Sequence, residues 1–184
     1  MSIEIKEELF TRYYNEEGKQ HREDGPAVIS SWGDEYWWIN GKLHREGGPA
    51  IIFSNGRKEW WINGKLHREG GPAIETEITK HWYINGLLHR EDGPAVITDS
   101  VNMWYMNNEL HRLNNPAIVY HSHKEESWYL FGLYYTRKKY FRIKRIIYKF
   151  INKVRKRLRD KLEVKLGSVG LDRYVINNIS VFAY

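Results

Sequence analysis

A histidine–arginine pair recurs five times in the first two thirds of the chain, and these residues are the ones most able to do chemistry. Imidazoles ligate metals and move protons near neutral pH, and guanidinium groups bind anions. Successive pairs are separated by 23, 23, 22 and 22 residues. The ten residues are His21, Arg22, His44, Arg45, His67, Arg68, His89, Arg90, His111 and Arg112. Such a row is either a repeated binding site or a repeated structural unit.

The regular spacing argues against a metal centre or an active site. If each repeat supplies two strands about 4.8 Å apart, equivalent imidazoles lie about 10 Å apart, whereas a metal holds its nitrogen ligands at about 2.1 Å. A catalytic site also needs unlike environments for its groups, which five equal copies do not provide. The chain has no cysteine and no phosphate-loop, serine-hydrolase or zinc-protease motif. We therefore expect no metal, no cofactor and no enzymatic activity.

The expected role of the row is structural. We expect each imidazole to hydrogen-bond a turn carbonyl and each guanidinium to pair with a neighbouring Glu or Asp. The surrounding residues repeat at fixed offsets: Trp stands seven residues before each of the last four His, and Pro-Ala begins five residues after every His. Asn40-Gly41 and its equivalents predict type I′ hairpin turns, so each repeat supplies two strands. The Gly-Pro step cannot continue a ladder and predicts a bulge or corner.

These offsets predict a mainly β fold, an elongated antiparallel β-hairpin array of about five to six repeats of 22–23 residues. A second aromatic residue follows each repeated tryptophan, and successive strand residues point to opposite faces of a sheet. One aromatic row then forms a core ladder, and the other is left half-exposed for a partner or a cover. The expected exposed aromatic row is Trp38, Trp61, Tyr83, Tyr105 and Tyr129.

The unit Trp-x-x-Asn-Gly-Lys-Leu-His-Arg, followed by Gly-Pro-Ala, resembles MORN-type repeats. It is similar to a divergent variant found in repeat proteins of large DNA viruses and bacteriophages. The resemblance covers residues 12–136 and departs from the standard unit at one position, since Arg follows each His where that unit has Gly. It implies an elongated hairpin array that serves as a scaffold or docking surface, with no shared enzymatic activity.

The composition changes after residue 136, and residues 137–166 predict one long basic amphipathic helix. Apolar residues recur at steps of three and four and form a stripe: Ile143, Ile146, Ile147, Phe150, Ile151, Val154, Leu158 and Leu162. The segment has 14 Lys or Arg against two acidic residues, a net charge of +12, whereas residues 1–136 have 14 against 20, a net charge of −6. The basic residues expected to contact a partner are Lys138, Lys139, Arg142, Lys144, Arg145, Lys149, Lys153, Arg155, Lys156, Arg157, Arg159 and Lys161.

Three interpretations of this helix stay open. Its length of about 45 Å matches an array of about 50 Å, so the apolar stripe could cover one aromatic face of the sheet. Its basic face could bind an acidic protein, a nucleic acid or another polyanion through charge. It could instead lie on an anionic membrane, which needs the stripe free to insert. The sequence favours a polyanion or an acidic protein.

The chain is therefore expected to have four parts: an N-terminal cap (1–11), the MORN-like array (12–136), the basic helix (137–166) and a C-terminal strand or tail (167–184). The absence of cysteine, of a secretion signal and of eighteen consecutive apolar residues predicts a cytoplasmic protein, in a virion or host cytoplasm if it is viral. The expected function is that of a non-enzymatic scaffold whose helix contacts an acidic partner, and open end strands would also allow self-association.

Overall fold

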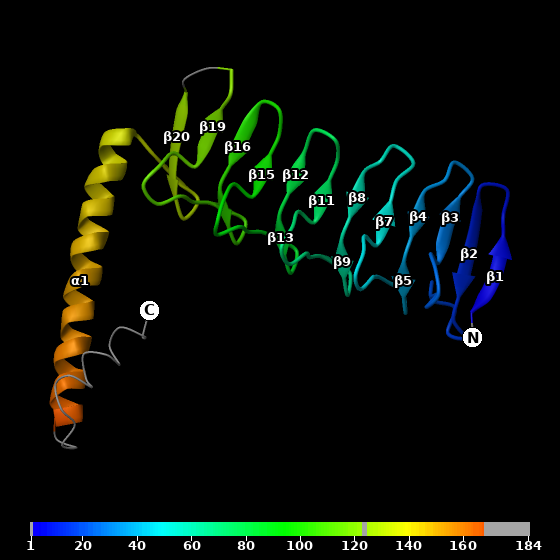
Figure 1. The fold of residues 1–184 in the computed structure, drawn as a ribbon, viewed down its shortest axis with the longest axis horizontal. Coiled ribbons are helices and arrows are strands. Elements are labelled where there is room, and N and C mark those ends of the chain that lie inside the picture. Colours follow the sequence, from blue (N-terminus) through cyan, green and yellow to red (C-terminus); the bar gives the residue numbers. More distant parts are fainter. Residues whose placement is uncertain (1, 123–124, 168–184) are drawn as a thin grey trace. The chain divides into compact units, whose positions relative to one another are not determined.

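The structure is a computed structural model that describes residues 2–122 and 125–167. The chain divides into two compact units, Met1–Tyr135 and Thr136–Tyr184. Every described strand belongs to the first unit, and the described part of the second unit is a single helix, α1 (Arg137–Gly167). The expected mainly β hairpin array with a C-terminal helix is therefore confirmed (Figure 1).

The first unit is built on a 13-stranded antiparallel sheet, in which the strands follow one another as a meander (Figure 1). Its strands, in spatial order, are β1 (Ile3–Lys6), β2 (Phe10–Tyr14), β3 (Val28–Ser30), β4 (Glu35–Tyr36), β7 (Ile51–Ile52), β8 (Lys58–Glu59), β11 (Ile74–Glu75), β12 (Lys80–His81), β15 (Val96–Ile97), β16 (Val101–Met103), β19 (Ile118–Tyr120), β20 (Glu126–Leu130) and β21 (Leu133–Tyr135). Two strands per repeat lie in this sheet, and the segment between them leaves it to form a second, smaller hairpin.

Four of these small hairpins are separate two-stranded sheets. They pair β5 (Trp38–Ile39) with β6 (Lys42–Leu43), β9 (Trp61–Ile62) with β10 (Lys65–Leu66), β13 (Tyr83–Ile84) with β14 (Leu87–Leu88), and β17 (Tyr105–Met106) with β18 (Glu109–Leu110). The turn residues Asn40 and Gly41 have φ of 49° and 76°, and the equivalent residues of the other hairpins also have positive φ. A type I′ turn requires positive φ at both central positions, so the expected turn chemistry is confirmed.

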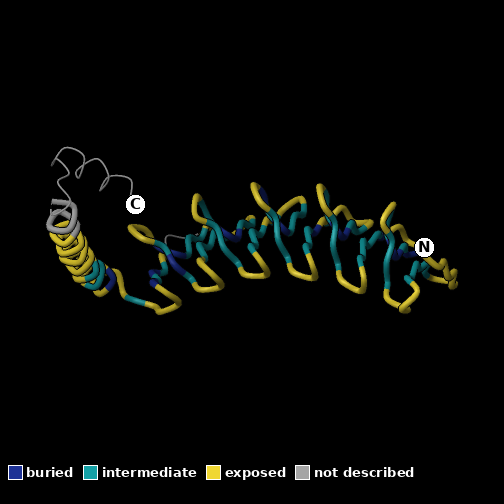
Figure 2. Tube along the Cα trace, turned by 90° about the horizontal axis from the view of Figure 1, so that it is seen from below, coloured by how far each residue is buried: buried dark blue, intermediate teal, exposed yellow. Residues whose placement is uncertain are grey.

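The core of the array is narrow and is centred on the repeated alanine. Ala27, Ala50, Ala73, Ala95 and Ala117 have no exposed surface. In the second repeat the backbone N–H of Trp37 donates to the carbonyl of Ala50 at 2.7 Å, which places the aromatic side chains beside this small residue. Figure 2 shows the result: buried positions run along the middle of the array, and exposed residues lie at its turns. A larger side chain at this fully buried position would have to displace its neighbours.

The two ends of the chain differ from the expected boundaries in one respect. The segment expected to be a cap, residues 1–11, contributes β1 and the start of β2 to the sheet, with register from Ile3 opposite Tyr14 to Lys6 opposite Thr11. The helix begins at Arg137 as expected and has Thr136 as its N-cap, because the Thr136 hydroxyl accepts the N–H of Lys139 at 3.4 Å. The C-terminal strand or tail expected over 167–184 lies outside the described residues, except for Gly167, where α1 ends.

Candidate functional site

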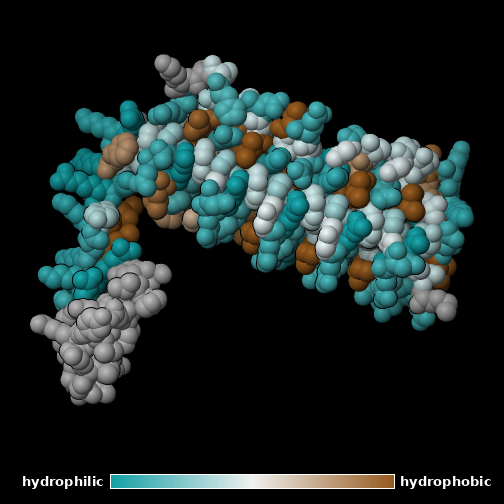
Figure 3. Space-filling model, viewed as in Figure 1, coloured by the Kyte–Doolittle hydropathy of each residue, from teal (hydrophilic) through white to brown (hydrophobic). Residues whose placement is uncertain are grey.

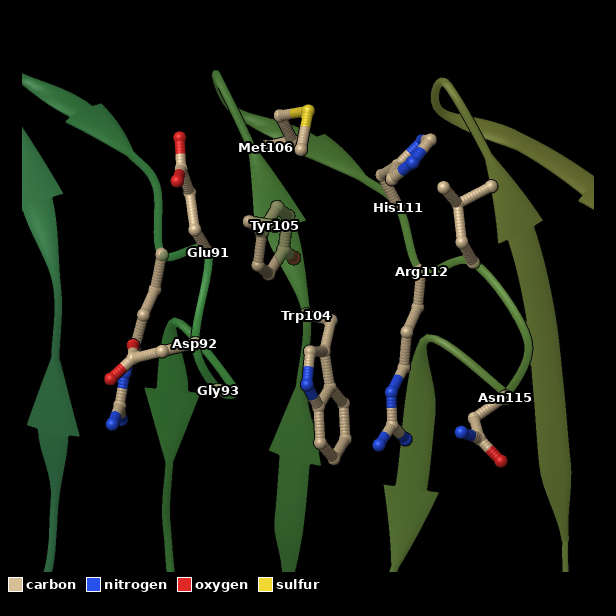
Figure 4. Close-up of a pocket in the computed structure, with 11 residues that line it drawn as sticks. Glu91, Asp92, Gly93, Trp104, Tyr105, Met106, His111, Arg112 and Asn115 are labelled. Atoms are coloured by element: carbon tan, nitrogen blue, oxygen red, sulfur yellow. The ribbon is translucent and has the colours of Figure 1, made fainter. Parts of the chain in front are cut away.

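The arginine of each His-Arg pair is stacked on the aromatic residue that begins its repeat. The Arg45 Cζ atom lies 3.8 Å from the Trp37 ring centroid, and the other four guanidinium groups lie 3.6–4.1 Å from Tyr13, Trp60, Trp82 and Trp104. Each guanidinium also donates to the carbonyl of the repeated proline, as Arg45 does to Pro49 at 3.1 Å. Figure 4 shows Arg112 beside Trp104 in this arrangement.

This stack explains the glycine before each of the first four repeated prolines. A Cβ atom built on Gly48 would lie 3.2 Å from the Arg45 Cζ atom, and one on Gly93 would lie 2.8 Å from the Arg90 Cζ atom. The Gly-Pro step lies outside the strands, whereas a bulge or corner within the second strand of the repeat was expected, and its glycine leaves room for the guanidinium. An ion pair between the arginine and a neighbouring Glu or Asp was expected in every repeat. Such a pair is close in two repeats, where the Nε atoms of Arg22 and Arg90 lie 2.8 Å from the Oδ1 atoms of Asp24 and Asp92.

The histidine of each pair joins one repeat to the next. The Nδ1 atom of His44 accepts the backbone N–H of Asn63, in the following turn, at 3.2 Å. His21, His67 and His111 accept the equivalent N–H groups at 3.1–3.2 Å, and the Nδ1 atom of His89 lies 2.9 Å from the Oδ1 atom of Asn107. The expectation that these imidazoles bond turn carbonyls was wrong, because the partner of Nδ1 in four repeats is a backbone donor. The histidine row thus satisfies turn N–H groups across repeat boundaries.

Acid should destabilise the array through its two histidines with lowered pKa. Burial lowers the pKa of His111, against an opposing effect of Glu109, and burial followed by the charge of Arg57 lowers the pKa of His81. Such imidazoles bind protons more readily in the unfolded chain, where the pKa is about 6.5. The contribution of these histidines to the free energy of unfolding is therefore fully present above about pH 6.5. It is lost as the pH decreases through the lower pKa of the folded state. The urea midpoint should be lower at about pH 5 than at about pH 7.5.

A His111→Asn variant tests this assignment, because its amide oxygen can accept the N–H of Phe131 without titrating. The loss of stability between the two pH values should be smaller in this variant than in the parent chain. His121→Asn is the matched control, since His121 is exposed, and should keep the parental dependence. An unchanged dependence in His111→Asn would remove His111 as its source.

The aromatic row expected to be half-exposed has intermediate exposure at all five positions: Trp38, Trp61, Tyr83, Tyr105 and Tyr129. The Trp61 Nε1–H donates to Glu59, a carboxylate that is only 5% exposed and also pairs with Arg57 at 2.5 Å. Burial raises the pKa of Tyr83 and of Tyr105. The side chains of the row thus pack among residues of the sheet, and on the face seen in Figure 3 apolar residues form small separate patches.

Clefts recur between successive His-Arg loops of the array. One lies between the first two repeats, with a volume of about 570 Å³, and two others lie between the third and fourth and between the fourth and fifth, with volumes of about 600 and 360 Å³. One wall of each is the His-Arg loop of one repeat, and the other wall carries the Trp, His and Arg of the next (Figure 4). The three clefts therefore occupy equivalent places in the repeat, and the last two are one repeat apart.

The residues of α1 expected to contact a partner are exposed, with the exception of the half-buried Lys144. Several apolar residues of the helix are exposed as well: Phe150 by 66%, Tyr148 by 63%, Ile146 by 59% and Leu158 by 55%. Among residues 137–161 of the helix, the half-buried or buried side chains other than Lys144 lie in the first three turns and are Tyr140, Ile143 and Ile147. Over residues 148–161 both the basic and the apolar side chains are exposed.

Neither the array nor the helix presents a metal centre within residues 2–122 and 125–167, where no group of three His, Asp or Glu side chains could hold an ion. The same residues contain no helix with the length and apolar character needed to span a bilayer. The candidate sites are thus the inter-repeat clefts and the surface of α1. No family model, curated protein or solved structure matches this chain, and its function is inferred from these surfaces alone.

Proposed function

We propose that the protein is a non-enzymatic, MORN-like interaction protein of the cytoplasm, in which the array is a docking scaffold and α1 contacts an acidic partner. The observation that carries this proposal is the charge of α1, which has 14 basic and two acidic residues among its 31. A cationic surface of this density attracts polyanions from a distance and releases their counterions on binding.

The positive charges at the N-terminus of α1 destabilise the isolated helix. The first turn contains Arg137, Lys138 and Lys139 and no acidic residue. Cations near a helix N-terminus oppose the helix dipole, at a cost of about 0.3–1 kcal/mol each. An anionic partner would remove this cost, whereas a helix that served only as a structural cover gains nothing from it. The distribution therefore supports a binding role for the helix.

The array has a different role in this proposal. Its repeated imidazole, guanidinium and indole groups bond to other groups of the array, as described above, and hold successive repeats together. Residues used in this way are poor candidates for catalysis, because a reacting group must be able to change its partners. The array is better suited to hold a fixed surface for docking.

An anionic membrane is the second candidate partner, and the exposed apolar stripe favours it. Ile146, Phe150 and Leu158 are each more than half exposed, and an interfacial helix inserts such residues below the headgroups. A nucleic acid would use the basic residues alone, since phosphate contacts need no apolar stripe. The two cases differ in which face of α1 they require.

The test compares the full chain with an α1 variant that carries Arg142→Glu, Lys149→Glu, Lys153→Glu and Lys156→Glu. Binding to poly-L-glutamate, to a DNA duplex and to phosphatidylserine vesicles is measured at about 50 and 200 mM salt. The parent should bind poly-L-glutamate, with an affinity at least about tenfold lower at the higher salt, and the variant should lose at least about tenfold at low salt. Binding that is absent or insensitive to salt in the parent would contradict the proposal.

The matched control changes four exposed lysines of the array to glutamate, which alters the net charge equally: Lys19, Lys42, Lys58 and Lys80. This control should bind like the parent. A third variant, with Ile146→Ser, Phe150→Ser and Leu158→Ser, separates the candidates. It should keep its binding to poly-L-glutamate, and loss of vesicle binding alone would identify the membrane as a true second partner.

A further inference from the structure

The loops between the His-Arg pairs and the prolines form an edge of the array on which negative charge faces outward. Four equivalent glutamates, Glu23, Glu46, Glu69 and Glu91, have side chains that are 84–90% exposed. The neighbouring Arg22, Arg68 and Arg90 side chains are only 21–31% exposed, because they are stacked on aromatic rings. This carboxylate row therefore carries one outward charge per repeat, and the compensating cations lie inward.

The clefts described above lie between these loops and have room for a long side chain. The lining of the cleft between the first two repeats includes three acidic residues and the apolar groups of Trp37 and Ile39, together with two arginines; the charged residues are Glu23, Asp24, Glu46, Arg22 and Arg45. A lining with apolar surface and carboxylates suits Lys and Arg, which pack their methylene stems on apolar groups and keep the cation in water. This cleft can thus hold one cationic side chain beside a carboxylate, and the two other clefts each have Glu91 and Asp92 in their linings beside two arginines.

The spacing of the clefts matches the spacing of cations on α1. Two strands per repeat place equivalent clefts about 10 Å apart. Residues seven apart on a helix lie on the same side and about 10.5 Å apart along its axis. Arg142, Lys149 and Lys156 have this separation, and Arg145 lies on the same side, three residues after Arg142. The four side chains are exposed. A helix laid along the edge could therefore place a cation beside successive glutamates of the row.

We propose that the loop edge of one chain binds the basic face of α1 from a second copy of the same chain. This inference rests on the proposed function, since it names one acidic partner of the helix. Residues 1–136 have a net charge of −6 and α1 has +12, so the two surfaces are complementary. The 31 residues of α1 extend for about 46 Å, which exceeds the roughly 30 Å from the first cleft to the last.

Each copy then offers one edge and one helix, so association is heterologous and gives closed dimers, rings or open chains. The occupied clefts leave the apolar stripe of α1 on the side of the helix away from the edge. Because both surfaces are exposed and highly charged, the association should weaken as salt screens them.

The experiment is sedimentation velocity on full-length chains over a range of concentration at low salt. The edge variant has Glu23→Lys, Glu46→Lys, Glu69→Lys and Glu91→Lys, and the helix variant has Arg142→Glu, Arg145→Glu, Lys149→Glu and Lys156→Glu. The parent should associate, each variant should weaken association at least about tenfold, and a chain with all eight changes should associate again because complementarity is restored with reversed sign. Melting curves check that every variant folds.

A matched control places the same charge change at four exposed acidic residues outside the loop edge, with lysine at positions Glu8, Glu77, Asp99 and Glu126. It should associate like the parent. A parent that stays monomeric, or an eight-residue variant that does not recover, overturns the inference. A monomeric parent that still binds poly-L-glutamate would overturn this inference but support the proposed function. A parent that neither associates nor binds poly-L-glutamate would contradict both.

Discussion

Replacement of Trp60 by alanine should lower the free energy of unfolding of the array by about 3 kcal/mol, near the lower end of the range for a large aromatic residue because Trp60 is half-buried. The Arg68 guanidinium stacks on the Trp60 indole, with its Cζ atom 3.7 Å from the ring centroid. Its loss leaves a gap beside Ala73, which has no exposed surface, and removes the stacking partner of a cation that is mostly covered. Urea unfolding followed by tryptophan fluorescence and circular dichroism measures the change.

The shape of the transition is a second readout of this variant. In a stacked array each repeat contacts only its neighbours, so a weak central repeat uncouples the two halves. The transition of Trp60→Ala should become broader, with a smaller denaturant dependence than that of the parent. Trp32→Ala is the matched control, because Trp32 is 54% exposed and lies in a turn, and should cost about 1 kcal/mol or less. Equal losses in the two variants would show that the stack does not support the array.

The hairpin architecture could be predicted because its signals are local and repeated. Asn40-Gly41 and its equivalents adopt positive φ, and the periodicity of 22–23 residues fixed two strands of the sheet per repeat. The sixth turn shows the limit of the rule. Phe131 occupies the place of Asn with φ of 50°, a conformation that a bulky side chain rarely adopts. The regular neighbours impose the turn there in spite of the local sequence.

The partners within the repeat were harder to predict. Arg45 and Trp37 are eight residues apart and meet only because a hairpin lies between them, although the constant Trp-to-Arg spacing was a usable signal. The role of His44 could not be predicted, since its partner is a backbone N–H that has no side-chain signature in the sequence. Strand alternation placed Trp61 on one face of the strand but gave no measure of its burial, which depends on Glu59 in β8 and on Arg57 just before that strand.

The net charge and the apolar stripe of α1 could be predicted from the sequence, because helical periodicity and net charge need no tertiary information. The surface that covers the apolar stripe could not be predicted, since an amphipathic helix is compatible with any apolar surface. The interpretation of the helix as a cover for the sheet therefore stays a prediction, as do the binding roles of its basic face and of its stripe. A charged face matched to the repeat spacing and an apolar face matched to lipid would allow two partners at once.

A Gly71→Ala substitution should destabilise the array by about 2 kcal/mol, although alanine is compatible with the backbone at this position. Gly71 does not have positive φ, so no backbone strain is expected. The added Cβ would lie 2.9 Å from the Arg68 Cζ atom. That guanidinium is held by the Trp60 ring and by a bond of 3.1 Å to the carbonyl of Pro72, so moving it breaks both contacts. Urea unfolding of the full chain measures the cost.

The same substitution should have the opposite sign when Arg68 is absent. In an Arg68→Ala chain the new methyl group meets no guanidinium, and alanine in place of glycine reduces the entropy of the unfolded chain. Gly71→Ala should then be neutral or stabilising by up to about 1 kcal/mol, which gives a coupling free energy of about 2–3 kcal/mol between the two positions. An equal loss of stability in both backgrounds would show that the glycine serves the corner alone. A reversal of sign would show that glycine is required here because the arginine needs its space.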